Sequence, residues 1–372
     1  MASRSARGTR LPQWYVVVPP LAALVLALTW SASLTGLIAA IVAIVLVGAV
    51  LAAVHHAEIV ALRVGEPFGS LILAVAVTVI EVGLIVSLMV SSPETTSALA
   101  RDTVFAAIMI TMNGILGVSI LVAVARHGLT SFNAEGSGAA LASVATLAAL
   151  TLVLPNFTSS EPGPVFSGTQ LAFAALASLV IYGVFVLTQT VQHRDFFLPV
   201  LPDGKPAQAD DDPDTHATPP TNREAAISLA LLLVSLVAVV GLAKVESPAI
   251  ESFVGEAGLP QAVVGVIIAL VILLPEFLAA ARAARRGRLQ TSINLAFGSA
   301  LASIGLTIPA LAVASIWLSG PLELGLGPTQ IVLLALTLFV AALTVIPGRV
   351  TRLQGAMHVV ILAAFLVLSV NP

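Results

Sequence analysis

Long apolar runs separated by short polar segments dominate the residue pattern of this chain. Each run approaches or exceeds the ~20 residues that a helix needs to cross ~30 Å of hydrocarbon. The runs are apolar throughout and do not alternate, so they predict helices and not the strands of a membrane barrel. By length alone we expect about eleven membrane helices. They cover residues 13–32, 35–60, 66–91, 102–126, 138–156, 169–192, 224–244, 260–284, 289–318, 327–346 and 350–370.

Composition supports the same interpretation. Of the 372 residues, 58% are hydrophobic and only 9% are charged, whereas a typical soluble domain has about 25% charged residues. The chain has no cysteine, which excludes thiolate metal sites, thiol catalysis and disulfides. The sequence therefore predicts an all-α polytopic membrane protein.

The positions of the basic residues predict its orientation. If the amino terminus is cytoplasmic, all 16 Lys and Arg except Arg101 and Lys244 fall on the cytoplasmic side of the predicted helices. Basic residues concentrate in cytoplasmic loops of membrane proteins. We therefore expect a cytoplasmic amino terminus and an external carboxyl end.

One polar segment, residues 193–223, interrupts the apolar pattern and is rich in Pro and Asp. Such a segment buries too little apolar surface to order itself, so it predicts a cytoplasmic linker between two halves. The expected organisation is a tail with the first helix (1–34), a first five-helix repeat (35–192), this acidic linker, and a second five-helix repeat (224–372).

Each half carries one carboxylate inside an otherwise apolar run. Glu81 lies within residues 71–90 and Glu276 within residues 261–284. An ionisable side chain inside a membrane helix costs a few kcal/mol, which marks it as a functional candidate. The two runs are five helices apart and so cross in opposite directions, as in an inverted repeat. In transporters of that design the substrate site lies near the midplane between the repeats, so we expect the two glutamates to meet there.

Hydroxyl and amide side chains on the same or neighbouring runs could complete an all-oxygen site. Calcium takes six to eight oxygen ligands at roughly 2.3–2.6 Å. Small residues and hydroxyls also serve helix packing in membranes, which leaves that alternative open. The candidate auxiliary ligands are Thr78, Asn113, Asn294, Ser299 and Ser303.

Carboxylates bind protons as well as cations. A site that holds either protons or a cation, and that faces the two sides alternately, is an antiporter. His358, in the last run, is a candidate for a proton path because histidine titrates near neutral pH. A passive cation channel remains the alternative from another class. The chain shows neither a nucleophile–base set nor an H-E-x-x-H motif, so an intramembrane enzyme is not expected.

Three segments carry a family resemblance: GEPFGSLILAVAVTVIEVGLIVSLMV, SINLAFGSALASIGLTIPAL and GRVTRLQGAMHVVILAAFLVL. They resemble the cation/calcium exchanger superfamily and, within it, the bacterial ChaA-type branch of the calcium/proton exchangers. The resemblance runs from about Gly65 to the carboxyl end. It implies eleven helices, with the second to sixth and the seventh to eleventh as inverted repeats, in a bacterial inner membrane.

The resemblance also implies site residues. The family's two ion-binding glutamates fall on Glu81 and Glu276, and the Gly-Ser pair of its ninth helix falls on Gly298–Ser299. Asn113–Gly114 resembles the corresponding pair in the fourth helix.

Many family members have Gly-Asn shortly before each glutamate, where this chain has Val77–Thr78 and Ile272–Leu273. We therefore expect a proton-coupled antiporter that exports calcium, with a sodium or potassium/proton antiporter as the alternative. The expected partners are inorganic cations, protons and the lipid bilayer, with neither a cofactor nor a nucleic acid.

Overall fold

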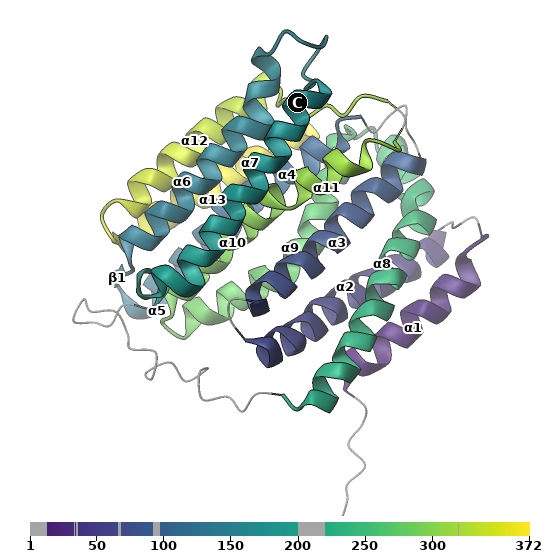
Figure 1. Cartoon of the computed structure of the whole chain (residues 1–372), viewed down its shortest axis with the longest axis horizontal. Helices are drawn as coiled ribbons and strands as arrows, with labels where there is room; N and C mark the ends of the chain where they lie inside the picture. The colour runs from purple at the N-terminus through teal and green to yellow at the C-terminus, as the bar shows by residue number, and fades with distance from the viewer. Residues whose placement is uncertain are drawn as a thin grey trace, which may run out of the picture.

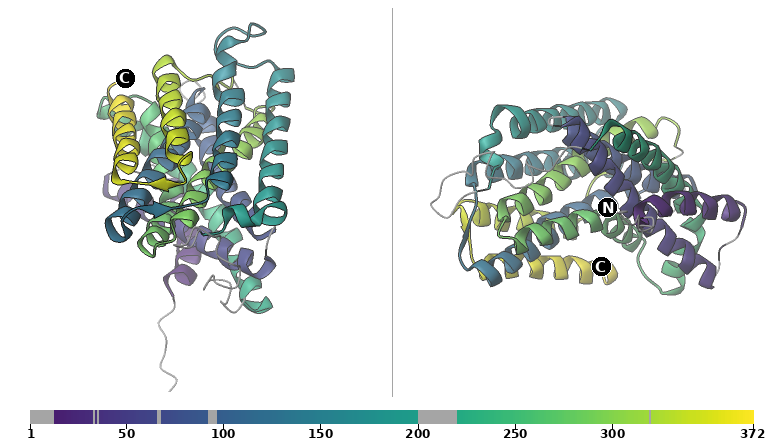
Figure 2. Two further views of the ribbon diagram at one scale, coloured as in Figure 1. Left: turned by 90° about the vertical axis from the view of Figure 1, so that its left-hand side faces the viewer. Right: turned by 90° about the horizontal axis from the view of Figure 1, so that it is seen from below.

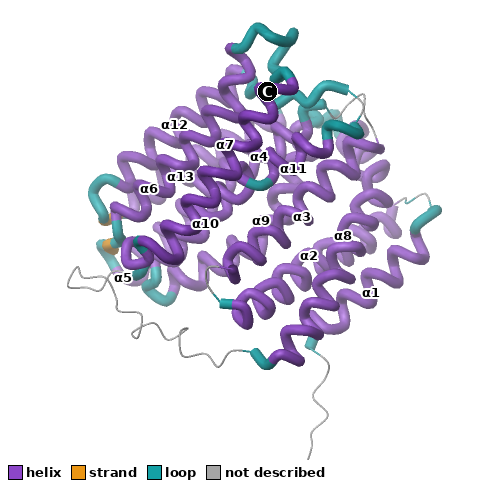
Figure 3. Tube along the Cα trace, in the orientation of Figure 1, coloured by secondary structure: helices purple, strands orange, loops and turns teal. Residues whose placement is uncertain are grey.

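The computed structural model describes residues 13–32, 34, 36–65, 68–91, 97–199, 220–318 and 320–372. Helices account for nearly all of this part of the chain (Figure 3). Ten of its helical segments are long and apolar enough to cross a membrane, and α1 (Trp14–Thr29) is a shorter apolar helix. The prediction of an all-α polytopic membrane protein is confirmed.

The first half follows α1 and ends before the segment that was predicted as a linker. Three of its long segments contain a π-helical turn, and the last two of these also end in a 3-10 turn. Its elements are α2 (Gly36–Val64), α3 (Phe68–Ser91), α4–η1–α5 (Leu99–Met109, Ile110–Ile115, Leu116–His127), α6–η2–η3 (Ala134–Ala148, Ala149–Val153, Leu154–Phe157) and α7–η4–η5 (Gly168–Leu187, Thr188–Gln192, Arg194–Phe197).

The second half repeats this plan with the opposite direction of crossing. Its elements are α8 (Asn222–Glu256), α9 (Ala262–Arg285), α10 and α11 (Leu289–Gly305, Thr307–Ala314), α12 (Pro328–Val345) and α13 (Arg352–Val370). In this inverted repeat α3 corresponds to α9, α4–α5 to α10–α11, and α7 to α13. The contact between α5 and α13 accordingly has its counterpart between α11 and α7.

The helices form two packed groups (Figure 1). On one flank α1, α2 and α8 pack together, with α3 against α2 and α8. On the other flank the halves interleave, so that α13 packs on α5 and α12 on α6 (Figure 2). The helices that carry the candidate site residues pack against, or belong to, one or both of these groups.

A short antiparallel ladder ties the two halves at one end of the bundle. β1 (Thr130–Ser131) pairs with β2 (Arg349–Val350), and the Phe132 amide donates to the Gly348 carbonyl over 2.9 Å. Most basic residues of the described helices and loops lie at this end, which we call the basic side. The other end, with Arg101 and Lys244, is the opposite side.

Three of the predicted runs differ clearly from the helices that the structure shows. α8 continues to Glu256 and not to residue 244, because a helix tolerates the charged residues and Pro248 of this stretch. The run predicted as 289–318 is broken at Leu306 into α10 and α11. The run predicted as 102–126 contains the π-helical turn η1.

The predicted linker, residues 193–223, lies largely outside the described residues, since 200–219 are not described. At its end Thr221 caps α8 by accepting the Glu224 amide, and the Glu224 side chain accepts the Thr221 amide in return. The domain boundaries themselves stay a prediction.

Candidate ion-binding site

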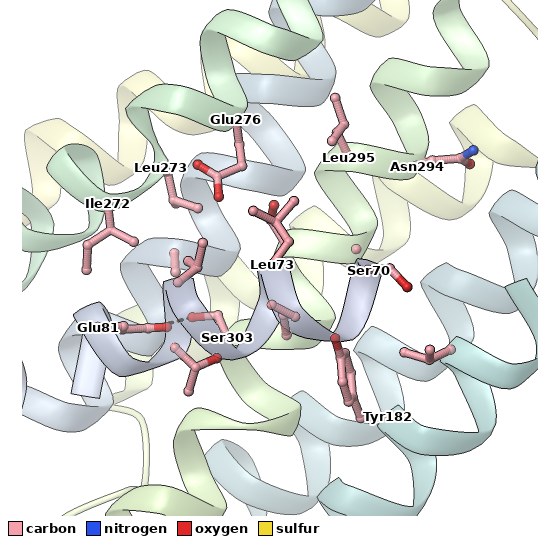
Figure 4. Close-up of a pocket in the computed structure, with 18 of the residues that line it drawn as sticks. Ser70, Leu73, Glu81, Tyr182, Ile272, Leu273, Glu276, Asn294, Leu295 and Ser303 are labelled. Carbon is pink, nitrogen blue, oxygen red and sulfur yellow. Dashed lines mark hydrogen bonds between the residues drawn. The ribbon is translucent and has the colours of Figure 1, made fainter. Parts of the chain in front are cut away.

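A cavity of about 170 Å³ lies between α3, α7, α9 and α10. Both Glu81 of α3 and Glu276 of α9 line it, and Figure 4 shows the two side chains approaching it from different helices. The volume is large enough for an ion together with several water molecules. The fold therefore brings two carboxylates of the opposite halves to one site: Glu81 is buried, and Glu276 is partly exposed with its Oε2 buried.

Glu81 is held by two hydroxyls. It is 3% exposed; Ser303 Oγ donates to its Oε1 over 2.6 Å and Thr307 Oγ1 to its Oε2 over 2.9 Å. Ser303 lies near the end of α10 and Thr307 begins α11, one turn further on. Both carboxylate oxygens are thus satisfied, as a buried polar group requires.

Glu276 has a different environment. Its Oε2 is buried and, among the described residues, has no hydrogen-bond partner. It lies within electrostatic range of Glu58 on α2 and of Glu81. Pro275 precedes it inside α9 and, lacking an N–H, leaves the carbonyl of Val271 without its usual helical donor. Glu276 is therefore the carboxylate whose hydrogen bonds are incomplete in this conformation.

The cavity extends toward the basic side. Ser70 at the start of α3, Gln189 near the end of α7 and Asn294 near the start of α10 all line it. At the opposite side α9 packs closely on α4: a Cβ added to Gly265 would lie 2.9 Å from the Thr103 backbone nitrogen. The site is thus approached from the basic side and covered by tight helix packing on the other.

Three of the candidate auxiliary ligands line the cavity near the glutamates: Thr78, Ser299 and Ser303. Asn294 lines it closer to the basic side, and its amide is already engaged. Its Nδ2 donates to the Phe197 carbonyl over 2.6 Å, and its Oδ1 accepts from Gln290 Nε2 over 2.9 Å. Asn294 therefore borders the approach to the site and does not contact either glutamate.

Asn113 and His358 lie elsewhere, in a buried polar cluster between η1, α12 and α13. Asn113 Nδ2 donates to Thr337 Oγ1 over 2.9 Å, while its Oδ1 is 3.1 Å from His358 Nδ1. His358 Nε2 is 3.2 Å from Thr344 Oγ1. Neither Asn113 nor His358 lines the cavity, so the expectation that Asn113 points at the glutamates is not met. The π turn that contains Asn113 changes the helical phase, which sequence spacing alone does not predict.

Sequence reasoning also missed two residues. Thr307 was not among the candidate ligands, although Ser299, Ser303 and Thr307 follow one another at i+4, the spacing of side chains that share one face of a helix. That spacing was the available signal. Glu58 carries no comparable signal, because only the packing of α2 brings it near Glu276 and Arg282.

The donor set is entirely oxygen: two carboxylates, three hydroxyls and backbone carbonyls. Within the described ranges, no group of three or more His, Cys, Asp or Glu could hold a metal ion. The arrangement suits a passing hard cation, bound partly by water, better than a permanently held metal.

Comparisons with known proteins match the chain over nearly its whole length. The family model described as "Sodium/calcium exchanger protein" matches residues 19–191 and 227–371. The chain is 46% identical over 376 residues to the putative ionic transporter y4hA of Sinorhizobium fredii, covering 100% of both chains. It is 33% identical over 367 residues to the sodium-potassium/proton antiporter ChaA of Escherichia coli, covering 98% of each.

Two solved structures share the fold. Native YfkE superposes with a TM-score of 0.69 at 15% identity, covering 96% of this chain and 99% of that one. The H⁺/Ca²⁺ exchanger CAX superposes with a TM-score of 0.66 at 15% identity, covering 95% of this chain and 92% of that one. The predicted arrangement of a first helix and two inverted five-helix repeats is confirmed by this likeness.

Proposed function

Because the chain belongs to the sodium/calcium exchanger protein family, a family of ion exchangers and not of enzymes, we propose that it is a proton-coupled cation antiporter. In this proposal it exports calcium from the cytoplasm in exchange for protons. Glu81 and Glu276 bind the cation and the protons in turn. Transport proceeds by alternating access at the cavity between the two halves.

One observation carries the proposal: two carboxylates from opposite halves line a single buried cavity. A net charge inside a membrane is costly, so the pair has to be neutralised by its occupants. One calcium ion or two protons achieve the same neutralisation. Competition between these occupants couples the two fluxes without a second site.

The hydroxyls define how the cation is held. Thr78, Ser299 and Ser303 supply neutral oxygens around the carboxylates, and water completes a coordination of six to eight. When a cation binds, Ser303 turns its lone pairs to the ion and gives up its hydrogen bond to Glu81. Asn294 acts at the approach to the site and not as a direct ligand.

A sodium or potassium/proton antiporter on the same scaffold is the second candidate. It is favoured by the 33% identity to a protein named as a sodium-potassium/proton antiporter. It is also favoured by the apolar side chains of Val77, Ile272 and Leu273, since additional amide oxygens there would help to complete a calcium shell. A passive cation channel is the alternative from another class: α9 packs closely on α4 at Gly265, but a second recess shares Thr78 with the cavity and reaches Lys244 at the opposite side.

The direction of transport follows from the orientation. If basic loops are cytoplasmic, the amino terminus is cytoplasmic, the carboxyl end is external, and the cavity opens to the cytoplasm of a bacterial inner membrane. A cytoplasmic cation then enters the site from the side that this conformation leaves accessible.

The test uses inverted membrane vesicles with an acid interior. Calcium, sodium and potassium are added separately, and dissipation of the acid gradient is followed with a pH-sensitive dye. We expect calcium, or in the second candidate a monovalent cation, to dissipate the gradient with the wild-type protein. Glu81→Gln and Glu276→Gln should each abolish the signal, because an amide neither carries the charge nor releases a proton.

Glu135→Gln is the matched control, because Glu135 is exposed at the start of α6 and far from the cavity lining. It should transport as the wild type does. Cation flux without proton movement would instead indicate a channel, and normal exchange by either cavity variant would exclude the paired-carboxylate mechanism.

A further inference from the structure

Two short segments of the inverted repeat carry the same motif. Residues 117–120 read GVSI and residues 305–308 read GLTI. In each motif a hydroxyl side chain follows a glycine by two positions: Ser119 in α5 and Thr307 in α11. The motif lies on the helix that follows the glutamate helix in each half.

Packing shows that the two motifs occupy corresponding places in the fold. A Cβ added to Gly117 would lie 2.8 Å from the Cβ of His358 on α13. A Cβ added to Gly305 would lie 2.7 Å from the Cβ of Tyr182 on α7. Since α7 and α13 are the last helices of their halves, both glycines make the same repeat-related contact. This register pairs Ser119 with Thr307.

The paired hydroxyls differ in what they bind. Thr307 donates to Glu81. Ser119 is 0% exposed, and its Oγ has no hydrogen-bond partner within the described part of the chain. Oε2 of Glu276 is likewise a buried atom without a hydrogen-bond partner among the described residues. A buried hydroxyl and a buried carboxylate oxygen without partners are each unfavourable, and these two stand in the positions that Thr307 and Glu81 fill in the other half.

The elements that carry them are already neighbours. α5 packs against α9, just as α11 packs against α3. A shift of α9 relative to α5 would change the separation between Ser119 and Glu276 while the two helices stay in contact.

Resting on the alternating access of the proposed function, we propose that Ser119 donates a hydrogen bond to Glu276 in the conformation that opens to the opposite side. That bond is the counterpart of the one from Thr307 to Glu81 in the present conformation. Each end state then has one glutamate held by the hydroxyl of its motif while the other is released to the cavity. Ser119 and Thr307 are positioning residues that stabilise opposite states.

Because the chain has no cysteine, single cysteines can report which side is accessible. Gln189→Cys lines the cavity near the basic side. Ser369→Cys lines a recess of about 140 Å³ between α4, α9, α12 and α13 at the opposite side. The reagent is a membrane-impermeant maleimide, applied to inverted vesicles for the first reporter and to right-side-out vesicles for the second.

Ser119→Ala should raise the labelling rate of Gln189→Cys and lower that of Ser369→Cys, because it destabilises only the state that opens to the opposite side. Thr307→Ala should shift both rates the other way. The loss of a hydrogen bond to a carboxylate is worth about a tenfold change in the ratio of the two rates. Ser119→Thr keeps the donor and should leave the ratio unchanged.

Ser178→Ala is the packing control, since Ser178 is also a fully buried serine whose Oγ lacks a partner among the described residues, but it lies on α7 outside the motif. It should not change the ratio. In a Glu276→Ala background, Ser119→Ala should have no further effect, which a purely structural role would not predict. Ser119→Gly replaces Ser119→Ala if the alanine variant fails to insert.

A shift in the same direction for Ser119→Ala and Thr307→Ala, or no shift for an inserted Ser119→Ala or Ser119→Gly variant, would overturn the proposal. Labelling does not depend on which ion is carried. A wild type that shows no cation-driven proton movement would therefore refute the proposed function, while the two labelling rates would still decide the pairing of Ser119 with Glu276.

Discussion

The two glutamate helices share a plan but are packed differently. α3 packs along α2 and α8, and the cavity lies between it and α10. α9 packs along α4 and α10, and Gly265 fits directly against the α4 backbone. Glu81 is fully hydrogen-bonded while Glu276 is not. In the proposed alternating-access cycle this difference would correspond to one state, and exchanging the two packings would give the other.

The residue at the same sequence distance before each glutamate illustrates this point. Ser70, before Glu81, lines the cavity, whereas Gly265, before Glu276, is pressed against α4. The first position borders open space and the second has no room for a methyl group. The comparison predicts unequal effects from similar substitutions.

The largest effect is expected for Gly265→Ala. The new Cβ would lie 2.9 Å from the Thr103 nitrogen and 3.0 Å from the Asp102 carbonyl carbon, and backbone atoms cannot move aside as a flexible side chain does. Overpacking costs about 1–3 kcal/mol. Labelling of Ser369→Cys should therefore increase about tenfold or more, and exchange in vesicles should slow to a similar degree.

Ser70→Ala is the matched control for Gly265→Ala, because it alters the corresponding position on the open side. Its labelling pattern should stay within about twofold of the wild type. Equal effects of Ser70→Ala and Gly265→Ala would mean that the difference between α3 and α9 has no part in closing the opposite side.

An intermediate effect is expected for two hydroxyl side chains of α10 that line the cavity, Ser303 and Ser299. Ser303→Ala removes the hydroxyl that contacts Glu81 and that, in the proposed function, turns to the cation, whereas Ser299→Ala removes a hydroxyl that lines the cavity without bonding either glutamate. We expect Ser303→Ala to weaken the apparent cation affinity about tenfold and Ser299→Ala to weaken it less. The measurement is the cation concentration that gives half-maximal proton movement.

Ser143→Ala, on the exposed face of α6, controls for a general loss of hydroxyl groups and should not change the affinity. If Ser299→Ala proved more damaging than Ser303→Ala, the cation would sit closer to the α10 residues near the basic side than to Glu81.

The smallest effect on transport is expected at Asn113. Asn113→Ala removes the donor to Thr337 Oγ1 and one of the two side-chain partners of His358, and buried polar atoms left unsatisfied cost about 1–3 kcal/mol of stability. The thermal unfolding midpoint in detergent should fall by several degrees, while the half-maximal cation concentration should change by less than about twofold. Thr344→Val provides a second test of the same cluster, since Thr344 Oγ1 contacts His358 as well as donating to the Val340 carbonyl of its own helix over 2.8 Å.

A large loss of cation affinity in Asn113→Ala, at unchanged thermal stability, would restore the original expectation that this amide is a ligand. The two halves would then supply ligands more equally than their present packing suggests.

The membrane topology could be predicted because it depends on length and polarity alone. Apolar runs such as 71–90 must be helical in a bilayer, and a carboxylate within such a run is conspicuous. The pairing of Glu81 with Glu276 followed from the inverted repeat. These inferences use features that survive small errors in helix boundaries.

The orientation of single side chains could not be predicted in the same way. The π turn at Ile110–Ile115 changes the phase of the helix, so Asn113 faces α12 and α13. The break at Leu306 similarly alters the path that places Thr307 against Glu81. Spacing along an ideal helix does not describe the position of Asn113, whereas Ser303 and Thr307, four residues apart, both reach Glu81 in spite of the break. Glu58 depends on tertiary packing alone.

The length of α8 has a consequence for the surrounding bilayer. Its 35 residues span about 50 Å, well beyond the ~30 Å of a hydrocarbon core. Such a helix has to tilt or project from the membrane, and its preferred tilt varies with acyl chain length. Since α8 packs on α1, α2 and α3, a thicker or thinner bilayer acts directly on the group of helices that borders the glutamate site. Turnover in liposomes should therefore depend on lipid chain length, with an optimum set by hydrophobic matching.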